Sequence, residues 1–216
     1  MYIPKYHAMP DCHEAHALID AYPLGAWVTP TDEGLVANHI PFVLDRSRGQ
    51  SGTLLGHVSR ANRVWEQLSE SAQSVVMFQG PQSYITPGWY PSKLEDGKVV
   101  PTWNYSVVHA HGVARAIDDR AWLYEILVRL TAVNESSRTA PWKVTDAPAD
   151  YIDKMIRAVV GIEIPIDRLV GKLKASQDET MPDRLGTVTG LMAEGTENAT
   201  KMASLVRLAI DHCEKI

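Results

Sequence analysis

Two kinds of hydrophobic spacing follow one another along this chain, and their order limits the fold more than any other feature. Up to about residue 117, short runs rich in β-branched and aromatic residues alternate with turn signals such as Asp32-Glu33-Gly34. Beyond that point, apolar residues mostly recur every three to four positions, which is the spacing of one helix face. The order predicts an α+β protein with a strongly curled, mostly antiparallel sheet or barrel that helices flank.

The turn signals divide the first part of the chain into expected strands at 25–30, 34–44, 52–58, 74–87 and 99–117. Asp11 and Glu14 have the spacing of a capping box, so a short helix is expected before these strands at 11–22. In 159–172, three isoleucines alternate with Glu163, Pro165 and Asp167, and this alternation predicts a sixth strand. It is placed at a sheet edge because Pro165 cannot donate to a neighbouring strand.

Helical spacing predicts four further helices, at 122–133, 151–159, 184–194 and 197–212. Gly195 is placed to end the third of them. We expect residues 1–175 to form a barrel domain with covering helices. Residues 176–216 are expected to form a helical tail that packs on the barrel or on a second copy of the chain.

The charge balance excludes several classes of protein. Twenty-one Lys and Arg against 26 Asp and Glu give 21 − 26 = −5, so the whole chain does not attract phosphate backbones or anionic membranes. No apolar run reaches the roughly 18 to 20 residues of a membrane span, and the N-terminus lacks the apolar core of a signal peptide. Cys12 and Cys213 form no C-x-x-C pattern. A cytoplasmic protein that binds any anion locally is expected.

One segment concentrates positive charge. Residues 46–63 contain four arginines and no acid, and Ser59, Arg60 and Asn62 stand between an expected strand and a helical pattern. A helix N-terminus and the Arg60 fork, which has no acid nearby in the sequence, suit a phosphate group. The alternative is that Ser59 or Asn62 caps a helix and the arginines are solvated.

Three other segments carry polar rings or cations. His109 and His111 lie on one face of the strand 99–117, where His39 or His57 would complete a metal site, but no carboxylate accompanies them and packing is the favoured interpretation. The loop 78–93 suits either stacking on a planar ligand or burial. Lys172 and Lys174 share a strand face, where lysines are usually solvated or block edge pairing.

Seven segments together resemble the PaiB-type FMN-binding negative transcriptional regulators. They are MYIPKYH at the start, ANHIPFVL (37–44), GHVSRAN (56–62), FQGPQSYITPGWYPSK (78–93), VPTWNYSVVHAHG (100–112), VGIEIPI (160–166) and GKLKASQ (171–177). The resemblance spans nearly the whole chain. It implies a split β-barrel related to the pyridoxamine-phosphate-oxidase group, a homodimer with FMN at its interface, and a role in regulating transcription.

The resemblance also implies a set of cofactor-binding residues, with Ser59-Arg60 at the phosphate and the lysines neutralising phosphate or the reduced ring. The set is Asn38, His39, Ser59, Arg60, Asn62, Trp103, Asn104, Lys172, Lys174 and Gln177. Two positions depart from the family pattern: Arg63 replaces a proline, and Asp178 replaces an asparagine. A carboxylate at 178 is unfavourable beside phosphate or reduced flavin.

Two other functions stay open at this point. One is an FMN-dependent oxidoreductase of the flavin reductase or oxidase type, and the other is a haem-handling split-barrel protein with His109 or His111 on the iron. Direct DNA binding is not supported, because the exposed faces of the tail helices carry both charges and resemble no recognition helix.

Overall fold

The computed structural model describes residues 1–9 and 11–213 and confirms the α+β class. Its strands are β1 (Leu24–Thr31), β2 (Gly34–Pro41), β3 (Val43–Asp45), β4 (Thr53–Ser59), β5 (Gln73–Ile85), β6 (Thr102–Val113), β7 (Arg115–Ile117), β8 (Val159–Pro165) and β9 (Arg168–Lys174). Its α-helices are α1 (Cys12–Ala21), α2 (Arg120–Glu135), α3 (Ala149–Arg157), α4 (Met181–Glu194) and α5 (Glu197–Cys213). Short 3₁₀ helices are η1 (Lys5–His7), η2 (Arg63–Gln67), η3 (Pro87–Trp89), η4 (Pro91–Leu94) and η5 (Val144–Asp146).

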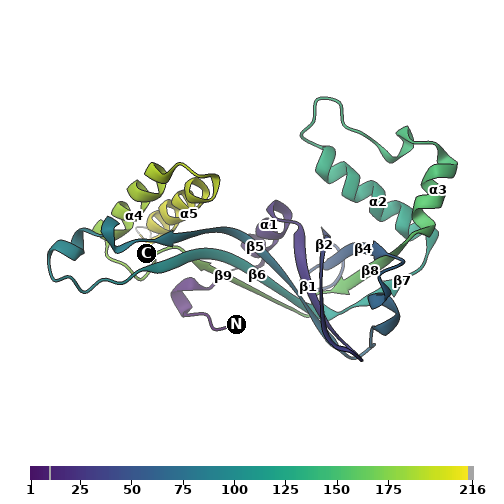
Figure 1. Cartoon of the computed structure of the whole chain (residues 1–216), viewed down its shortest axis with the longest axis horizontal. Coiled ribbons are helices and arrows are strands. Elements are labelled where there is room, and N and C mark those ends of the chain that lie inside the picture. Colours follow the sequence, from purple (N-terminus) through teal and green to yellow (C-terminus); the bar gives the residue numbers. More distant parts are fainter. Residues whose placement is uncertain (10, 214–216) are drawn as a thin grey trace. The chain divides into compact units, whose positions relative to one another are not determined.

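The strands form two sheets rather than one closed barrel. The five-stranded sheet has the order β2-β1-β5-β6-β9, and the four-stranded sheet has the order β3-β4-β8-β7. Figure 1 labels the strands of both sheets except β3. β1 pairs antiparallel with β2 and β5, and β4 pairs antiparallel with β3 and β8. The mostly antiparallel sheet expected from the alternating pattern is therefore confirmed.

The chain forms two compact units, each built from separate stretches of sequence. Unit 1 contains residues 1–15, 79–108 and 171–216, and unit 2 contains residues 16–78 and 109–170. The division between residues 175 and 176 that the sequence suggests stays a prediction.

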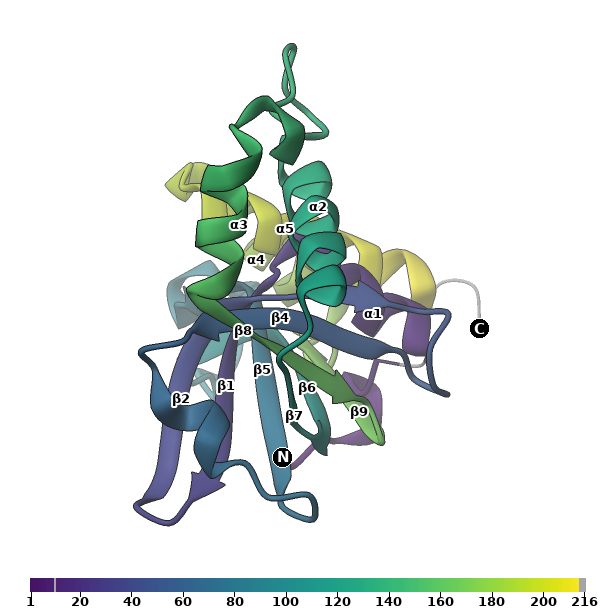
Figure 2. The ribbon, with the colours of Figure 1, turned by 90° about the vertical axis from the view of Figure 1, so that its right-hand side faces the viewer.

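In unit 2, helices α2 and α3 pack together, and both contact β8 (Figure 2). The α2 side chains Ile126 and Leu130 are buried against Leu55 of β4. Asp119 caps α2 by accepting a hydrogen bond from the Trp122 N–H at 2.8 Å. The two covering helices expected from the three-to-four-residue spacing are thus present.

The expected single edge strand at 159–172 is wrong. The chain turns after Pro165, so that β8 lies between β4 and β7 while β9 joins the other sheet beside β6. The turn is fixed by backbone bonds from the Ile166 N–H to the Gly52 carbonyl and from the Asp167 N–H to the His111 carbonyl. Pro165 is tolerated because it is the last residue of β8, where the ladder ends.

In unit 1, α4 and α5 form a helical hairpin around a shared apolar core. Buried side chains of both helices meet Ile85 of β5 and Tyr90 of the following loop; they include Val188, Leu191, Met202, Val206 and Ile210. Gly195 ends α4 with a left-handed φ of 66°, as the sequence predicts. No described helix, in either unit, is long and apolar enough to cross a bilayer. The side chain of Cys213 lies outside the described residues.

We expect Gly186→Ala to destabilise the protein. An added Cβ at this α4 position would lie 2.0 Å from the backbone carbonyl oxygen of Trp89, so the loop would have to move. Overpacking of this kind costs about 1–3 kcal/mol or more and outweighs the gain of about 1 kcal/mol in helix propensity. Chemical denaturation should show a lower free energy of unfolding. Thr189→Ala, an exposed position on the same helix, is the control, and a Gly186→Ala variant as stable as the wild type would contradict this packing.

Candidate functional site

The arginine-rich segment 46–63 is neutralised by acids, most of them from distant parts of the chain. Arg48 pairs with the buried Glu163 of β8 at 2.7 Å, and Arg60 pairs with Asp118. Arg46 pairs with Asp20, and Arg63 pairs with Glu66. The segment therefore presents much less positive charge than its local sequence indicates.

The Arg60 fork is engaged, which corrects the expectation that it has no acidic partner. Its Nη1 and Nη2 donate to the two carboxylate oxygens of Asp118 at 3.0 and 2.5 Å, and Nε donates to the Arg157 carbonyl at 2.8 Å. The Arg60 hydrogen bonds lower the pKa of Asp118. A phosphate at Arg60 would have to compete with this pair, and the role of Arg60 at a cofactor stays a prediction.

The other predicted residues of unit 2 hold the chain that follows β4. Asn62 caps η2 by accepting from the Val64 N–H, and its amide donates to the Asn38 side-chain oxygen at 2.6 Å. Ser59 Oγ accepts from the Ala61 N–H at 3.3 Å, while His39 is exposed on β2. The expected helix after Ser59 is a five-residue 3₁₀ helix, so the capping interpretation holds for Asn62 and no long helix points at a ligand.

Unit 1 contains a groove of about 420 Å³ between the N-terminal segment, β6 and the end of β9. We call it the lysine groove. Its lining residues are Tyr2, Pro4, Tyr6, His7, Thr102, Trp103, Tyr105, Lys172, Lys174 and Asp178. Three of the ten predicted cofactor residues, namely Trp103, Lys172 and Lys174, meet here.

The two lysines of the groove have polar contacts but no carboxylate partner among residues 1–9 and 11–213. Lys172 Nζ donates to the Tyr2 carbonyl at 3.3 Å and lies 5.1 Å from the centre of the Tyr105 ring. Lys174 Nζ donates to Thr102 Oγ1. Each ammonium carries three N–H donors, so both lysines retain donors for an anion.

The N-terminal segment builds one wall of the groove. The Met9 N–H donates to the Gly171 carbonyl at 3.1 Å, and Ala8 forms an antiparallel bridge with Lys172. This contact buries His7 to 3% exposure, and neither of its ring nitrogens has a hydrogen-bond partner among the described residues. The nearest acid is Asp178, whose Oδ1 lies 3.6 Å from Nε2.

The His7 ring is surrounded by opposing charges. Burial is the main cause that lowers the pKa of the imidazole; Asp178 acts in the opposite direction, and Lys172 and Lys174 add to the lowering. His7 is therefore a neutral ring at pH 7, with one nitrogen that donates and one that accepts.

Asn104 and Gln177 stabilise the turn after β9 and do not line the groove. Asn104 is fully buried on the opposite face of β6 from Trp103, and its amide donates to Ser176 Oγ at 2.8 Å. The Gln177 side chain accepts from the Ala175 N–H at 2.7 Å and donates to the Leu173 carbonyl at 2.8 Å. Ser176 between them has a left-handed φ of 60°.

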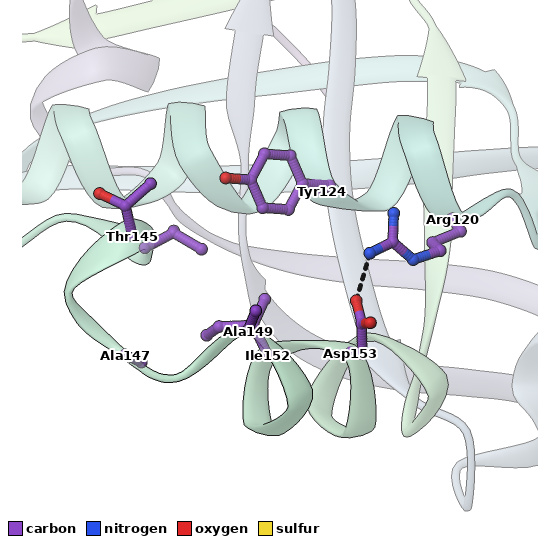
Figure 3. A pocket seen from close by; sticks show the side chains of 8 residues that line it. Arg120, Tyr124, Thr145, Ala147, Ala149, Ile152 and Asp153 are labelled. Carbon is purple, nitrogen blue, oxygen red and sulfur yellow. Dashed lines mark hydrogen bonds and ion pairs between the residues drawn. The ribbon is translucent and has the colours of Figure 1, made fainter.

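A second cavity, of about 350 Å³, lies in unit 2 between α2, η5 and α3 (Figure 3). Its walls are largely apolar, and the Arg120–Asp153 ion pair closes one end. Because its two charged groups neutralise each other, it offers an anion or a cation little attraction. It contains none of the residues predicted from the sequence.

Among the described residues, the two histidines suggested as metal ligands have no third metal-ligating side chain beside them. His109 and His111 have ring centres 6.3 Å apart, and burial is the main cause that lowers the pKa of each. Within the described part of the chain, no three His, Cys, Asp or Glu side chains are placed to hold a metal ion.

Sequence reasoning missed His7, Tyr2, Tyr6 and Asp178 as neighbours of the lysines. The available signal was the ring-rich start of the chain, MYIPKYH, which contains three aromatic or imidazole rings in seven residues. Nothing in the local sequence says that this segment lies along β9, some 165 residues later.

The chain matches known proteins over most of its length. A family model described as "Putative FMN-binding domain" matches residues 1–168. An uncharacterised protein of Emericella nidulans is 34% identical, with 96% of each chain covered. Protease synthase and sporulation protein PAI 2 of Bacillus subtilis is 27% identical, with 95% of this chain and 96% of that protein covered.

A solved structure supports the fold. The FAD and haem binding protein of Mycobacterium smegmatis aligns with a TM-score of 0.57 over 78% of this chain and 73% of its own, at 19% sequence identity. At that identity the likeness concerns the fold, which is the split-barrel arrangement expected from the sequence.

We expect Gln177→Ala to lower stability. The change leaves the Ala175 N–H and the Leu173 carbonyl without their partner, which costs about 1–3 kcal/mol for partly buried groups. Urea denaturation of the ligand-free protein measures it, with Gln82→Ala, an exposed glutamine, as the control. Unchanged stability together with weakened flavin binding would instead place Gln177 at the cofactor.

Proposed function

Because this chain belongs to the FMN-binding domain family, we propose that it binds FMN and that the lysine groove holds the cofactor. The observation that carries the proposal is a pair of lysines on the wall of a groove in unit 1, Lys172 and Lys174, which form no ion pair with a carboxylate among the described residues. Elsewhere, the four arginines of segment 46–63 are all paired with acids.

The residues of the groove fit a flavin phosphate. An ammonium group binds phosphate as a compact charge, and two of them on alternate positions of β9 match a dianion. His7 supplies two buried ring nitrogens that form no hydrogen bond with the described residues, and these suit a ligand with both donors and acceptors. Asp178 opposes an anion, but its side chain is 40% exposed and lies beside His7.

The rings of the groove fit a planar ligand. Trp103 is 53% exposed, and it makes an edge-to-face contact with Tyr84 at 6.0 Å between ring centres. Tyr6 is 56% exposed, so both rings offer faces for stacking. A bound flavin supplies hydride and electron transfer, while the chain binds and orients it.

We also propose that the protein is a homodimer. Met181, Leu185 and Met192 follow one stripe of α4 and are 37%, 54% and 45% exposed, whereas Val188 and Leu191 of the same helix are buried. Apolar side chains that cluster in this way usually meet a partner.

The relative in Bacillus subtilis is named for protease synthesis and sporulation. We propose that any regulatory role of this chain acts through the flavin or through a protein partner. The net charge of −5 and the paired arginines of segment 46–63 argue against direct binding to DNA.

If Lys174 contacts the phosphate, Lys174→Ala should lower the affinity for FMN but not the affinity for riboflavin. Removing one charge-assisted contact costs about 1.5–3 kcal/mol, so FMN affinity should fall about 10-fold to 150-fold. Riboflavin, which lacks the phosphate, should bind as before. Fluorescence titration measures both, with the exposed Lys98→Ala as a control of equal charge.

The same titration with Arg60→Ala tests the sequence-based phosphate site. Because the Arg60 fork is held by Asp118, its removal should change FMN affinity less than Lys174→Ala does. A larger and FMN-selective loss at Arg60 would move the phosphate to unit 2 and contradict the proposal for the lysine groove.

If α4 forms the dimer contact, Leu185→Glu should lower the molecular mass of the protein in solution from that of a dimer to that of a monomer. Light scattering at micromolar concentration should give a dimer for the wild type and a monomer for the variant, because a carboxylate cannot be buried in an apolar contact without large cost. Ala193→Glu, on another exposed face of α4, should stay dimeric. A monomeric wild type would refute the proposal.

A further inference from the structure

We propose that His7 is a third, proton-dependent cation of the lysine groove, and that the protein takes up a proton at His7 when the acidic group of its ligand binds. The inference rests on the proposed function, because it concerns the same groove and the same ligand phosphate. It adds a residue and a chemical event that anion binding by two lysines does not require.

The first support is the enclosure of the ring. His7 is 3% exposed, packs edge-to-face on Tyr6 at 4.5 Å, and leaves both ring nitrogens without a hydrogen bond among the described residues. A buried polar group without partners costs free energy. His7 is one of the residues that line the groove, so the charge of a ligand seated there acts on the ring at short range.

The second support is the set of charges that face the ring. The titratable groups that line the groove with His7 are Tyr2 and Tyr6 of the N-terminal segment, Tyr105 of β6, Lys172 and Lys174 of β9, and Asp178 after β9. Asp178 lies 3.6 Å away, close enough to hold an imidazolium once it forms. In the ligand-free protein, burial and the two lysines keep the pKa of His7 below its ordinary value.

A bound phosphate reverses this balance. Its negative charge offsets Lys172 and Lys174, and it attracts a proton to the ring directly, so the pKa of His7 rises on binding. By linkage, the protonated protein binds the anion more tightly. The contribution of His7 to affinity is therefore complete below its pKa in the free protein and disappears as pH rises through its pKa in the complex.

The test compares FMN binding to the wild type and to His7→Gln between pH 5 and 8.5, by fluorescence titration. FMN affinity itself changes near pH 6, where the phosphate gains its second charge, so the ratio of the two dissociation constants isolates His7. As pH falls, we expect the FMN affinity of the wild type to rise about tenfold relative to that of His7→Gln. This ratio corresponds to a rise of about one unit in the pKa of His7 on binding. For riboflavin, the ratio of the two dissociation constants should not change with pH.

Proton uptake is the second readout. Calorimetry of FMN binding in two buffers of different ionisation enthalpy should show more protons bound by the wild type than by His7→Gln. Asp178→Asn keeps the ring but removes its nearest negative charge, so it should move the uptake to lower pH. This variant also carries the test if His7→Gln does not fold.

The outcomes separate the two proposals. If FMN does not bind to the wild type, the proposed function fails. If FMN binds but the ratio is constant with pH and Asp178→Asn does not move the proton uptake, the role of His7 is refuted while the proposed function stands.

Discussion

The contact between the N-terminal segment and β9 determines most of what the lysine groove can do. The Met9 N–H binds the Gly171 carbonyl, and Ala8 bridges Lys172, so the segment lies along the strand that carries both lysines. A side chain at position 171 would crowd this contact, because an added Cβ would lie 2.4 Å from the Met9 sulfur and 2.9 Å from the Met9 Cβ. The burial of His7, the carbonyl contact of Lys172 and one wall of the groove all follow from this single docking.

Local sequence predicts elements well where their pattern is complete within a short window. The repeated apolar spacing of α4 and α5, and Gly195 between them, contain all the information that ends one helix and begins the next. The strand break at Pro165 is different. It depends on backbone partners at Gly52 and His111, which the sequence places more than 50 residues away.

Local sequence is a still poorer guide to which charged side chains are paired in the fold. The arginines of segment 46–63 stand out in the sequence because the segment itself contains no acid, yet Asp118 and Glu163 reach Arg60 and Arg48 through the fold. Lys172 and Lys174 look ordinary in the sequence but form no ion pair with a carboxylate in the described structure. Alternation along a strand was enough to place these two lysines together, whereas the position of His7 beside them required the fold.

The groove is assembled from both ends of the chain, and this affects how the protein is made. Lys172 binds the carbonyl of Tyr2, and His7 lies beside Asp178, so these contacts join residues about 170 positions apart. Contacts of such long range form late, because the loop between them must close first. The ribosome completes both stretches of unit 2, which end at residue 170, before it adds Lys172 and Lys174. During synthesis, residues 2–9 are therefore made before β9, the strand that they contact in the folded protein.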